Sequence, residues 1–198
     1  MRDNGGQAIF FYSRHRITAE IILSKLRASR GNLDGLRPED LYPHDQDHYG
    51  GLNANDVLAA ATGIGEGTRV ADFCAGLGGP ARYLASRYGA LVTGVELTPA
   101  RVRGANVLTQ LVGLQQRVQI VEGNVMAAPI PDKSVDVVIS QEALLHIPHR
   151  RRAMAEAFRI LRRRGRLAFT DWVAPAPLAK DDADLLWEGQ SRPIAGKP

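Results

Sequence analysis

The amino-acid sequence predicts an α/β domain in which a mostly parallel sheet is covered by helices on both faces. From residue 69 onwards, short β-branched or apolar runs alternate with stretches of helical length, and this alternation is typical of parallel sheets with helical crossovers. Right-handed crossovers place the carboxyl ends of all the strands along one edge, where open α/β sheets bind ligands. The predicted strands span residues 69–74, 90–96, 118–122, 135–140 and 166–172, and the helices between them span residues 80–88, 99–114 and 149–163.

A separate N-terminal segment precedes this alternation. Apolar residues recur at helical spacing within residues 7–30, with charged residues between them, and predict an amphipathic helix that ends at Gly31. Residues 31–51 are rich in Gly, Pro, Asp and His, which predicts an irregular connection before a short helix near residues 55–62.

The bulk composition favours a single domain. The 198 residues can form a substantial core, and the 44% hydrophobic content can fill it. No apolar run reaches the roughly 20 residues of a membrane span, and the N-terminus lacks the pattern of a secretory signal. Cys74 is the only cysteine and cannot form an internal disulfide. We therefore expect a cytoplasmic protein without membrane contacts.

The net charge of +4 and the pI of 9.5 raise the question of a nucleic-acid partner. We interpret the arginine-rich segment as the solvated face of an amphipathic helix whose apolar side carries Met154, Ala157, Phe158 and Leu161. A patch for nucleic acid or an acidic partner is the alternative, but no interleaved aromatic residues offer a stacking platform for bases. The arginines of this segment are Arg150, Arg151, Arg152, Arg159, Arg162, Arg163, Arg164 and Arg166.

A glycine-rich turn follows the first predicted strand. Gly76, Gly78 and Gly79 lie before a helix whose first turn carries Pro80, a residue suited to that position. Glycines let the backbone turn sharply and approach a ligand closely. The pattern Gly76-x-Gly78-x-x-Ala81 also satisfies the dinucleotide fingerprint, so the turn alone does not distinguish between cofactors.

Two acidic residues favour a cofactor that carries an amino acid. Asp72 lies on the first strand, four positions before Gly76, where a carboxylate repels a pyrophosphate but can accept a hydrogen bond from an ammonium group. Glu96 ends the next strand, where a carboxylate can bind both ribose hydroxyls. An ordinary acid near a helix N-terminus is the alternative interpretation of Glu96.

The segment VADFCAGLGGPARYLA, residues 70–85, and the acid at Glu96 resemble motif I and the acidic motif of class I S-adenosylmethionine-dependent methyltransferases. The resemblance covers residues 50–173 and includes the runs VDVVIS and GRLAFTDW. It implies the Rossmann-like fold of that class, S-adenosylmethionine as cofactor and S-adenosylhomocysteine as product. The cofactor-binding residues that it implies are Asp72, Ala75, Gly76, Gly78, Gly79, Glu96, Leu97, Arg101, Asn124, Val125 and Gln141.

The sequence departs from this family at three places. Asn124, expected beside the adenine, stands where Asp is common, and residues 162–165 replace a common Pro-Gly-Gly turn. Only about 25 residues follow Trp172, whereas the family continues with a helix and an antiparallel strand pair. We therefore expect the last two strands to be lacking, either through truncation or because a partner subunit covers the exposed edge in a homodimer.

The segment SQEALLHIPHR, residues 140–150, most resembles small-molecule N- and O-methyltransferases of the sarcosine/dimethylglycine, phosphoethanolamine and natural-product sugar types. The resemblance implies that His146 lies at the substrate, that Asp171 orients it, and that Glu142 lines the substrate site. Histidine is well suited to take a proton near neutral pH, and a carboxylate can fix its tautomer. Purely structural roles at helix starts and loops are the alternative for all three residues.

Residues 44–51, HDQDHYGG, are called the lid segment below. Two histidines and two aspartates there suggest a metal site, but a loop lacks the rigid frame that such ligands need, so we expect no metal. The resemblance implies that this segment covers the cofactor, with Tyr49 near its carboxylate and Tyr12 as a second candidate.

These observations predict an S-adenosylmethionine-dependent methyltransferase that acts on nitrogen or oxygen of a small molecule. A cofactor-binding protein without turnover, a truncated methyltransferase and an NAD(P)-dependent oxidoreductase are the alternatives. We expect an N-terminal helix and lid over residues 1–50, a cofactor-binding core over residues 51–173 and a tail over residues 174–198.

Overall fold

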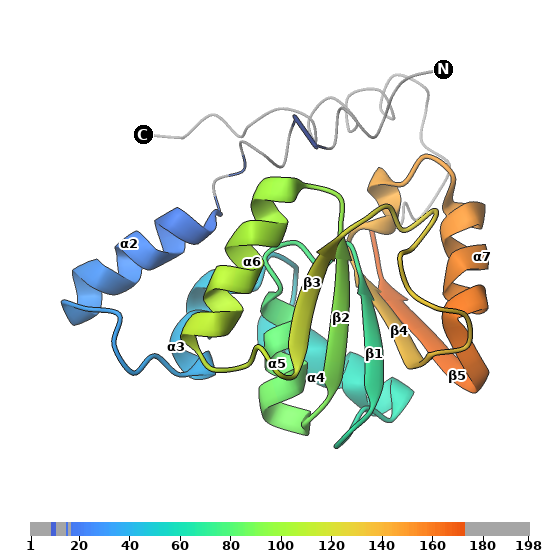
Figure 1. Cartoon of the computed structure of the whole chain (residues 1–198), viewed down its shortest axis with the longest axis horizontal. Helices are drawn as coiled ribbons and strands as arrows, with labels where there is room; N and C mark the ends of the chain where they lie inside the picture. Colours follow the sequence, from blue (N-terminus) through green and yellow to red (C-terminus); the bar gives the residue numbers. More distant parts are fainter. Residues whose placement is uncertain (1–8, 11–14, 16, 173–198) are drawn as a thin grey trace.

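The computed structural model describes residues 9–10, 15 and 17–172, and it has the predicted α/β architecture (Figure 1). Five strands form one sheet in the order β3-β2-β1-β4-β5, and every neighbouring pair is parallel. Crossover connections therefore place the carboxyl ends of the strands along one edge, as expected. The strands are β1 (Arg69–Phe73), β2 (Leu91–Glu96), β3 (Val118–Glu122), β4 (Val135–Gln141) and β5 (Leu161–Thr170).

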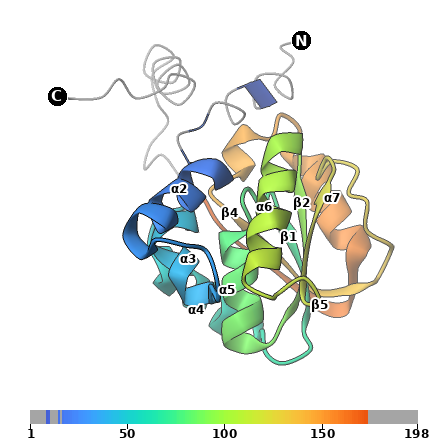
Figure 2. The ribbon, with the colours of Figure 1, turned by 60° about the vertical axis from the view of Figure 1, so that its left-hand side comes forward.

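Helices cover both faces of the sheet. One face packs on α4, α5 and α6, and the other packs on α7, because alternate strand residues point to opposite faces. Helices α2 and α3 form an outer layer against α6 and α5 (Figure 2). The helices are α2 (Ala19–Arg30), α3 (Pro38–Asp45), α4 (Gly51–Thr62), α5 (Gly79–Tyr88), α6 (Pro99–Leu111), the 3-10 helix η1 (Leu144–His146) and α7 (Arg150–Ile160).

The N-terminal elements differ from the prediction in two respects. Helix α2 begins at Ala19 rather than near residue 7, because Thr18 is extended and its hydroxyl accepts from the Ile21 N–H at 3.3 Å. Residues 38–45, predicted as irregular, form α3. The Asp40 carboxylate accepts from the backbone N–H that precedes this helix, and Leu41 is fully buried.

Helix α7 is shorter than predicted. It ends at Ile160 rather than near residue 163, because Leu161 already pairs with β4. Residues 162–165 bulge out of β5 instead of forming a loop before it. Phe158 was wrongly placed on the apolar side of this helix: it is 83% exposed, whereas Ala153 and Ala157 are buried.

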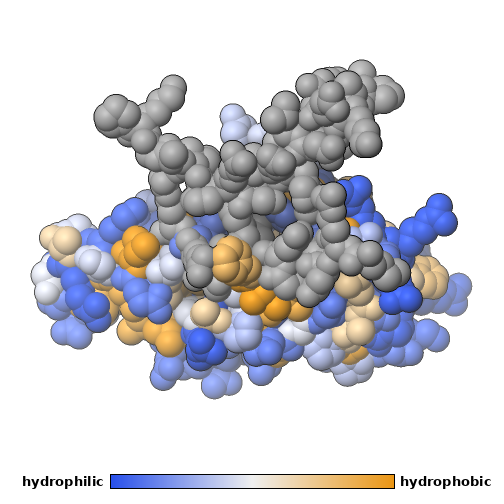
Figure 3. Space-filling view, turned by 90° about the horizontal axis from the view of Figure 1, so that it is seen from above, coloured by the Kyte–Doolittle hydropathy of each residue, from blue (hydrophilic) through white to orange (hydrophobic). Residues whose placement is uncertain are grey.

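The outer surface is mixed in character. Apolar and hydrophilic residues are interspersed on the described surface seen from above (Figure 3). None of the helices among residues 9–10, 15 and 17–172 is long and apolar enough to cross a membrane. The described residues do not include Tyr12 or the chain beyond Trp172, and the latter contains the predicted tail.

A buried ion pair joins α3 to α5. The Arg82 guanidinium donates to the Asp45 carboxylate at 2.9 Å, and both side chains are fully buried. Arg82 also donates to the carbonyl of Ala105 and the hydroxyl of Thr109 on α6. Because these bonds compensate the cost of burying the charges, α3 is fixed over the amino end of α5.

Gly79 makes this contact possible. A Cβ atom on Gly79 would lie 2.0 Å from the backbone oxygen of Asp45, which is far inside van der Waals contact. The end of α3 therefore rests directly on the first turn of α5, and the lid segment starts from a rigid base.

We expect Asp45→Asn to lower the free energy of unfolding by about 3–5 kcal/mol, because it leaves the Arg82 charge buried without a counter-charge. Urea unfolding of the two proteins measures this loss. Glu66→Gln is the matched control, since it breaks the exposed Arg117–Glu66 pair and should cost less than about 1 kcal/mol. Equal losses in the two variants would contradict the role given to the buried pair.

Candidate active site

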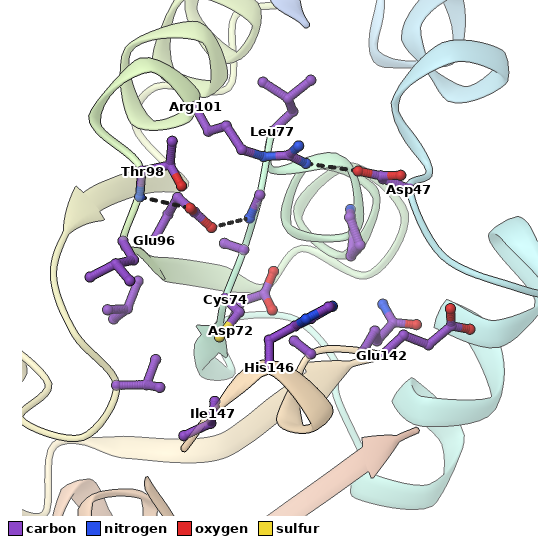
Figure 4. Close-up of a pocket in the computed structure, with 18 of the residues that line it drawn as sticks. Asp47, Asp72, Cys74, Leu77, Glu96, Thr98, Arg101, Glu142, His146 and Ile147 are labelled. Carbon is purple, nitrogen blue, oxygen red and sulfur yellow. Dashed lines mark hydrogen bonds and ion pairs between the residues drawn. The ribbon is translucent and has the colours of Figure 1, made fainter. Parts of the chain in front are cut away.

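A cavity opens at the carboxyl edge of the sheet, at the ends of β1, β2, β3 and β4 (Figure 4). Its wall combines the segments that follow these four strands with the lid segment and η1. Most of the residues predicted for the cofactor and acceptor sites lie together here. Those in the wall are Asp72, Ala75, Gly76, Glu96, Leu97, Arg101, Asn124, Val125, Gln141, Glu142 and His146.

Four predicted residues lie outside the wall. Gly78 is the N-cap of α5 in the left-handed conformation, with φ of 75°, and Gly79 packs on the end of α3. Tyr49 lies on the outer side of the lid segment and is 78% exposed. Asp171 directly follows β5. The two glycines therefore shape the turn, while Gly76 alone of the three borders the cavity.

Glu96 ties together the two turns that flank the cavity. One of its carboxylate oxygens accepts from the Gly76 N–H at 3.0 Å, and the other accepts from the Thr98 N–H at 2.8 Å. The residue is only 7% exposed. Because it holds the β1–α5 turn and the β2–α6 turn at once, Glu96 sets the distance between the two halves of the wall.

Asp72 is a buried acid that faces the same space. It is 3% exposed, and its Oδ2 atom has no hydrogen-bond partner among the described residues. Burial, reinforced by the nearby negative charge of Glu96, raises the pKa of Asp72 to about 7. The Oε1 atom of Gln141 is buried and without a described partner as well. Two orphaned acceptors fit a ligand that brings hydrogen-bond donors and positive charge.

The lid segment is held across the cavity on one side by an ion pair. Arg101, at the start of α6, donates to the Asp47 carboxylate at 2.8 Å, and the guanidinium lies over the bare Cα of Gly76. Figure 4 shows this bridge above the Glu96 carboxylate. The sequence suggested Asp47 only as a metal ligand, and its partner is 54 residues away along the chain, so spacing could not reveal the pair.

On the other side, Glu142 connects three segments. Its backbone has a positive φ of 50°, and its N–H donates to the Thr170 carbonyl. The carboxylate accepts from the backbone N–H of Tyr49 at 2.7 Å and from the indole N–H of Trp172 at 3.2 Å. The rings of Tyr49 and Trp172 meet edge to face, 5.8 Å apart. Glu142 therefore fastens the lid segment to the end of β5.

Hydrogen bonds between buried side-chain amides connect the lid segment, α4 and the end of β4. Asn55 on α4 is fully buried; it donates to Gln46 and accepts from the side-chain amide of Gln141, both at 2.8 Å. Asn55 and Gln46 were not predicted as site residues. A buried polar residue on a helix is visible only once the packing is known, because Asn is normally a surface residue.

His146 reaches the cavity from η1. Burial lowers the pKa of His146, and the negative charge of Asp171 acts in the opposite direction with a smaller effect. The imidazole is therefore neutral near pH 7 and can accept a proton. The predicted proximity of the two groups agrees with this electrostatic influence, although Asp171 is not part of the cavity wall.

The charge of the wall is unbalanced. Asp72, Glu96 and Glu142 take part in none of the ion pairs formed by residues 15 and 17–172. Asp45 and Asp47 are neutralised by arginines. Two carboxylates without a cation, beside the acid of Asp72 with its pKa of about 7, favour a positively charged ligand and oppose a pyrophosphate.

Comparison with known proteins identifies the family. The methyltransferase domain family matches residues 71–169, which are 99 of the 198 residues. A glycine/sarcosine/dimethylglycine N-methyltransferase from Actinopolyspora halophila is 36% identical over 126 residues, covering 64% of this chain and 21% of the relative. A sterol 24-C-methyltransferase from Gibberella zeae is 33% identical over 127 residues, covering 64% of this chain and 33% of the relative.

A solved structure agrees with these similarities. The crystal structure of a candidate sarcosine dimethylglycine methyltransferase from Galdieria sulphuraria has a TM-score of 0.59 and 30% identity, over 61% of this chain and 46% of that chain. The chain belongs to the class I S-adenosylmethionine-dependent methyltransferases, as the resemblance implied. It spans less than half the length of each of these three proteins. The names of the two relatives specify nitrogen and carbon acceptors, so membership alone does not fix the acceptor atom.

We expect Asp72→Asn to remove a pH-dependent loss of stability from the unliganded protein. Between about pH 4 and pH 7 the folded carboxyl stays protonated while the unfolded one is ionised, so raising the pH destabilises the folded wild type. The free energy of unfolding of Asp72→Asn minus that of the wild type should increase by about 1.4 kcal/mol for each unit that the pH rises in this range. Urea unfolding at pH 5, 6 and 7 measures it, and a difference that does not vary with pH would refute the assignment.

Proposed function

We propose that the cavity binds S-adenosylmethionine and that the chain transfers its methyl group to nitrogen or oxygen of a small molecule. The observation that carries this proposal is the pair of buried carboxylates, Asp72 and Glu96, at the ends of neighbouring strands. A ligand with an ammonium group and a ribose would suit both: Asp72 would accept from the ammonium, and Glu96 would accept from the ribose hydroxyls with the lone pairs that its bonds to Gly76 and Thr98 leave free.

The rest of the wall suits the same ligand. Leu97 and Val125 would bracket the adenine, with Asn124 offering a donor and an acceptor at its edge. Gly76 would let the amino-acid end approach the backbone, and Gln141 would present its free oxygen beside it. Arg101 and the lid segment would close over the ligand, with Tyr49 holding the segment to Glu142.

When bound, S-adenosylmethionine supplies an electrophilic methyl group attached to a sulfonium. The protein's task is then to position the acceptor in line with that group and to exclude water. His146 would take the proton from a hydroxyl acceptor, or hold an amine with its lone pair directed at the methyl group. Asp171 would favour the protonated imidazole once the proton has moved.

Glu142 has a less direct part in this mechanism than the sequence implied. Both of its oxygens already accept hydrogen bonds, from Tyr49 and from Trp172. These donors are neutral, so no cation among its hydrogen-bond partners offsets an acidic side chain at the acceptor end of the cavity. A cationic amine acceptor would be attracted there, while the lid segment stays fastened.

The alternatives require different ligands or no turnover. A nicotinamide dinucleotide would place its pyrophosphate near three carboxylates without ion-pair partners, which is electrostatically unfavourable. A protein that only binds the cofactor would use the same cavity, so cofactor binding does not separate it from an enzyme. Transfer of a methyl group to an acceptor does.

We expect the protein to methylate members of a panel of small amines and hydroxyl compounds. Mass spectrometry would detect this as a gain of about 14 Da, because one methyl group replaces one hydrogen. His146→Ala should slow transfer to a hydroxyl acceptor by about 100-fold or more, with binding of S-adenosylhomocysteine retained. His149→Ala is the matched control, because His149 is exposed and its side chain makes no capping bond to α7. Wild-type turnover in His146→Ala would rule out the proposed base, and no transfer to any acceptor would favour the binding-only alternative.

A further inference from the structure

A network on α7 holds the loop that follows β3. The Arg159 guanidinium donates to the carbonyls of Ala128 and Ile130, each at 2.9 Å. It also donates to the carboxylates of Glu156, one turn earlier on the helix, and Asp132. Glu156 in turn accepts from the Ala128 N–H at 2.8 Å. Helix α7 is thereby connected to residues 128–132 by both backbone and side-chain bonds.

This loop leads directly to the cavity wall. Pro129 lies between the two carbonyls that Arg159 holds, and its ring packs on Gly123, where a Cβ would be 2.7 Å from the Pro129 Cδ atom. Gly123 lines the cavity, and so do the next three residues, Asn124 to Met126. Val125 and Ala128 are buried in the same core cluster. The position of Pro129 therefore sets where this part of the wall stands.

The geometry requires an arginine. Two backbone carbonyls and two carboxylates surround one guanidinium, and its planar fork of five donors can serve all of them at once. A lysine ammonium is a point donor on a flexible stem and cannot span the two carbonyls together. The Arg159 side chain is 31% exposed and that of Glu156 is 19% exposed, so water competes only in part.

We propose that Arg159 and Glu156 are positioning residues for the adenine-binding wall, acting through residues 128–130 on Gly123 and Asn124. They touch no ligand themselves. The inference rests on the proposed function, since it takes the cavity wall at residues 123–126 to be the place of the adenine. Arg159 was predicted to be a solvated arginine of the arginine-rich segment, and the structure shows it bonded to the loop instead.

The test compares Arg159→Lys with Arg162→Lys, which alters another arginine–carboxylate pair, to Asp136, away from the loop. Calorimetry measures binding of S-adenosylhomocysteine and of adenosine, which carries only the nucleoside half. We expect Arg159→Lys to weaken both ligands by about tenfold or more and by the same factor, because the lost bonds act on the adenine side. Arg162→Lys should leave both affinities within about twofold of wild type.

Two further measurements separate positioning from general destabilisation. Hydrogen exchange should become faster at the amides of residues 124–128 in Arg159→Lys and should stay unchanged in α5. If Arg159→Lys does not fold, Glu156→Gln tests the same bonds, since Glu156 accepts from Ala128 and from Arg159. We expect it to weaken adenosine binding in the same direction.

The outcomes are distinct. Wild-type affinities in Arg159→Lys, or a loss of stability without a loss of adenosine affinity, would overturn the positioning role and leave the proposed function standing. A lower affinity of Arg159→Lys for S-adenosylhomocysteine alone, with unchanged adenosine affinity, would also overturn the positioning role. The effect would then lie on the amino-acid side of the ligand. A wild-type protein that binds neither ligand would overturn the proposed function and this inference with it.

Discussion

The site depends on one buried carboxylate that joins two turns. Glu96 accepts from the N–H groups of Gly76 and Thr98, and so fixes the carboxyl ends of β1 and β2 relative to each other. Burial raises the pKa of Asp72, and the negative charge of Glu96 on the neighbouring strand raises it further. Glu96 thus contributes both to the geometry of the cavity and to its electrostatics. The cavity that results would attract a cationic ligand and repel an anionic one.

The other parts of the cavity wall are held in place by hydrogen bonds and ion pairs to neighbouring segments. The Asp45–Arg82 pair secures the base of the lid segment, and Glu142 and Arg101 secure its two sides. Arg159 holds the loop after β3, and Asn55 holds Gln141. Methyl transfer places modest chemical demands on side chains and strict demands on position. A site built mainly from positioning contacts, with one imidazole near the acceptor, agrees with those demands.

Sequence patterns predicted the sheet well and the connections poorly. The strands were found because β-branched runs bounded by turn residues have few alternatives, and Asp72, Gly76 and Glu96 follow from their spacing on those strands. Helix α3 was missed because its stability comes from burying Leu41 against α2 and α6 and from pairing Asp45 with Arg82 on α5, which spacing does not reveal. The end of α7 was misplaced because helix-favouring arginines continue past the point where Leu161 joins the sheet. The contact between Tyr49 and Glu142 joins residues 93 positions apart, beyond the reach of any local pattern.

The most direct measurement is calorimetry of S-adenosylhomocysteine binding at pH 6.5 in two buffers with different ionisation enthalpies. If its ammonium group meets Asp72, the carboxyl that is largely protonated in the unliganded protein must ionise, and binding at this pH should release about three quarters of a proton. The buffer dependence should disappear in Asp72→Asn. Binding without proton release, or no binding at millimolar ligand, would contradict the account.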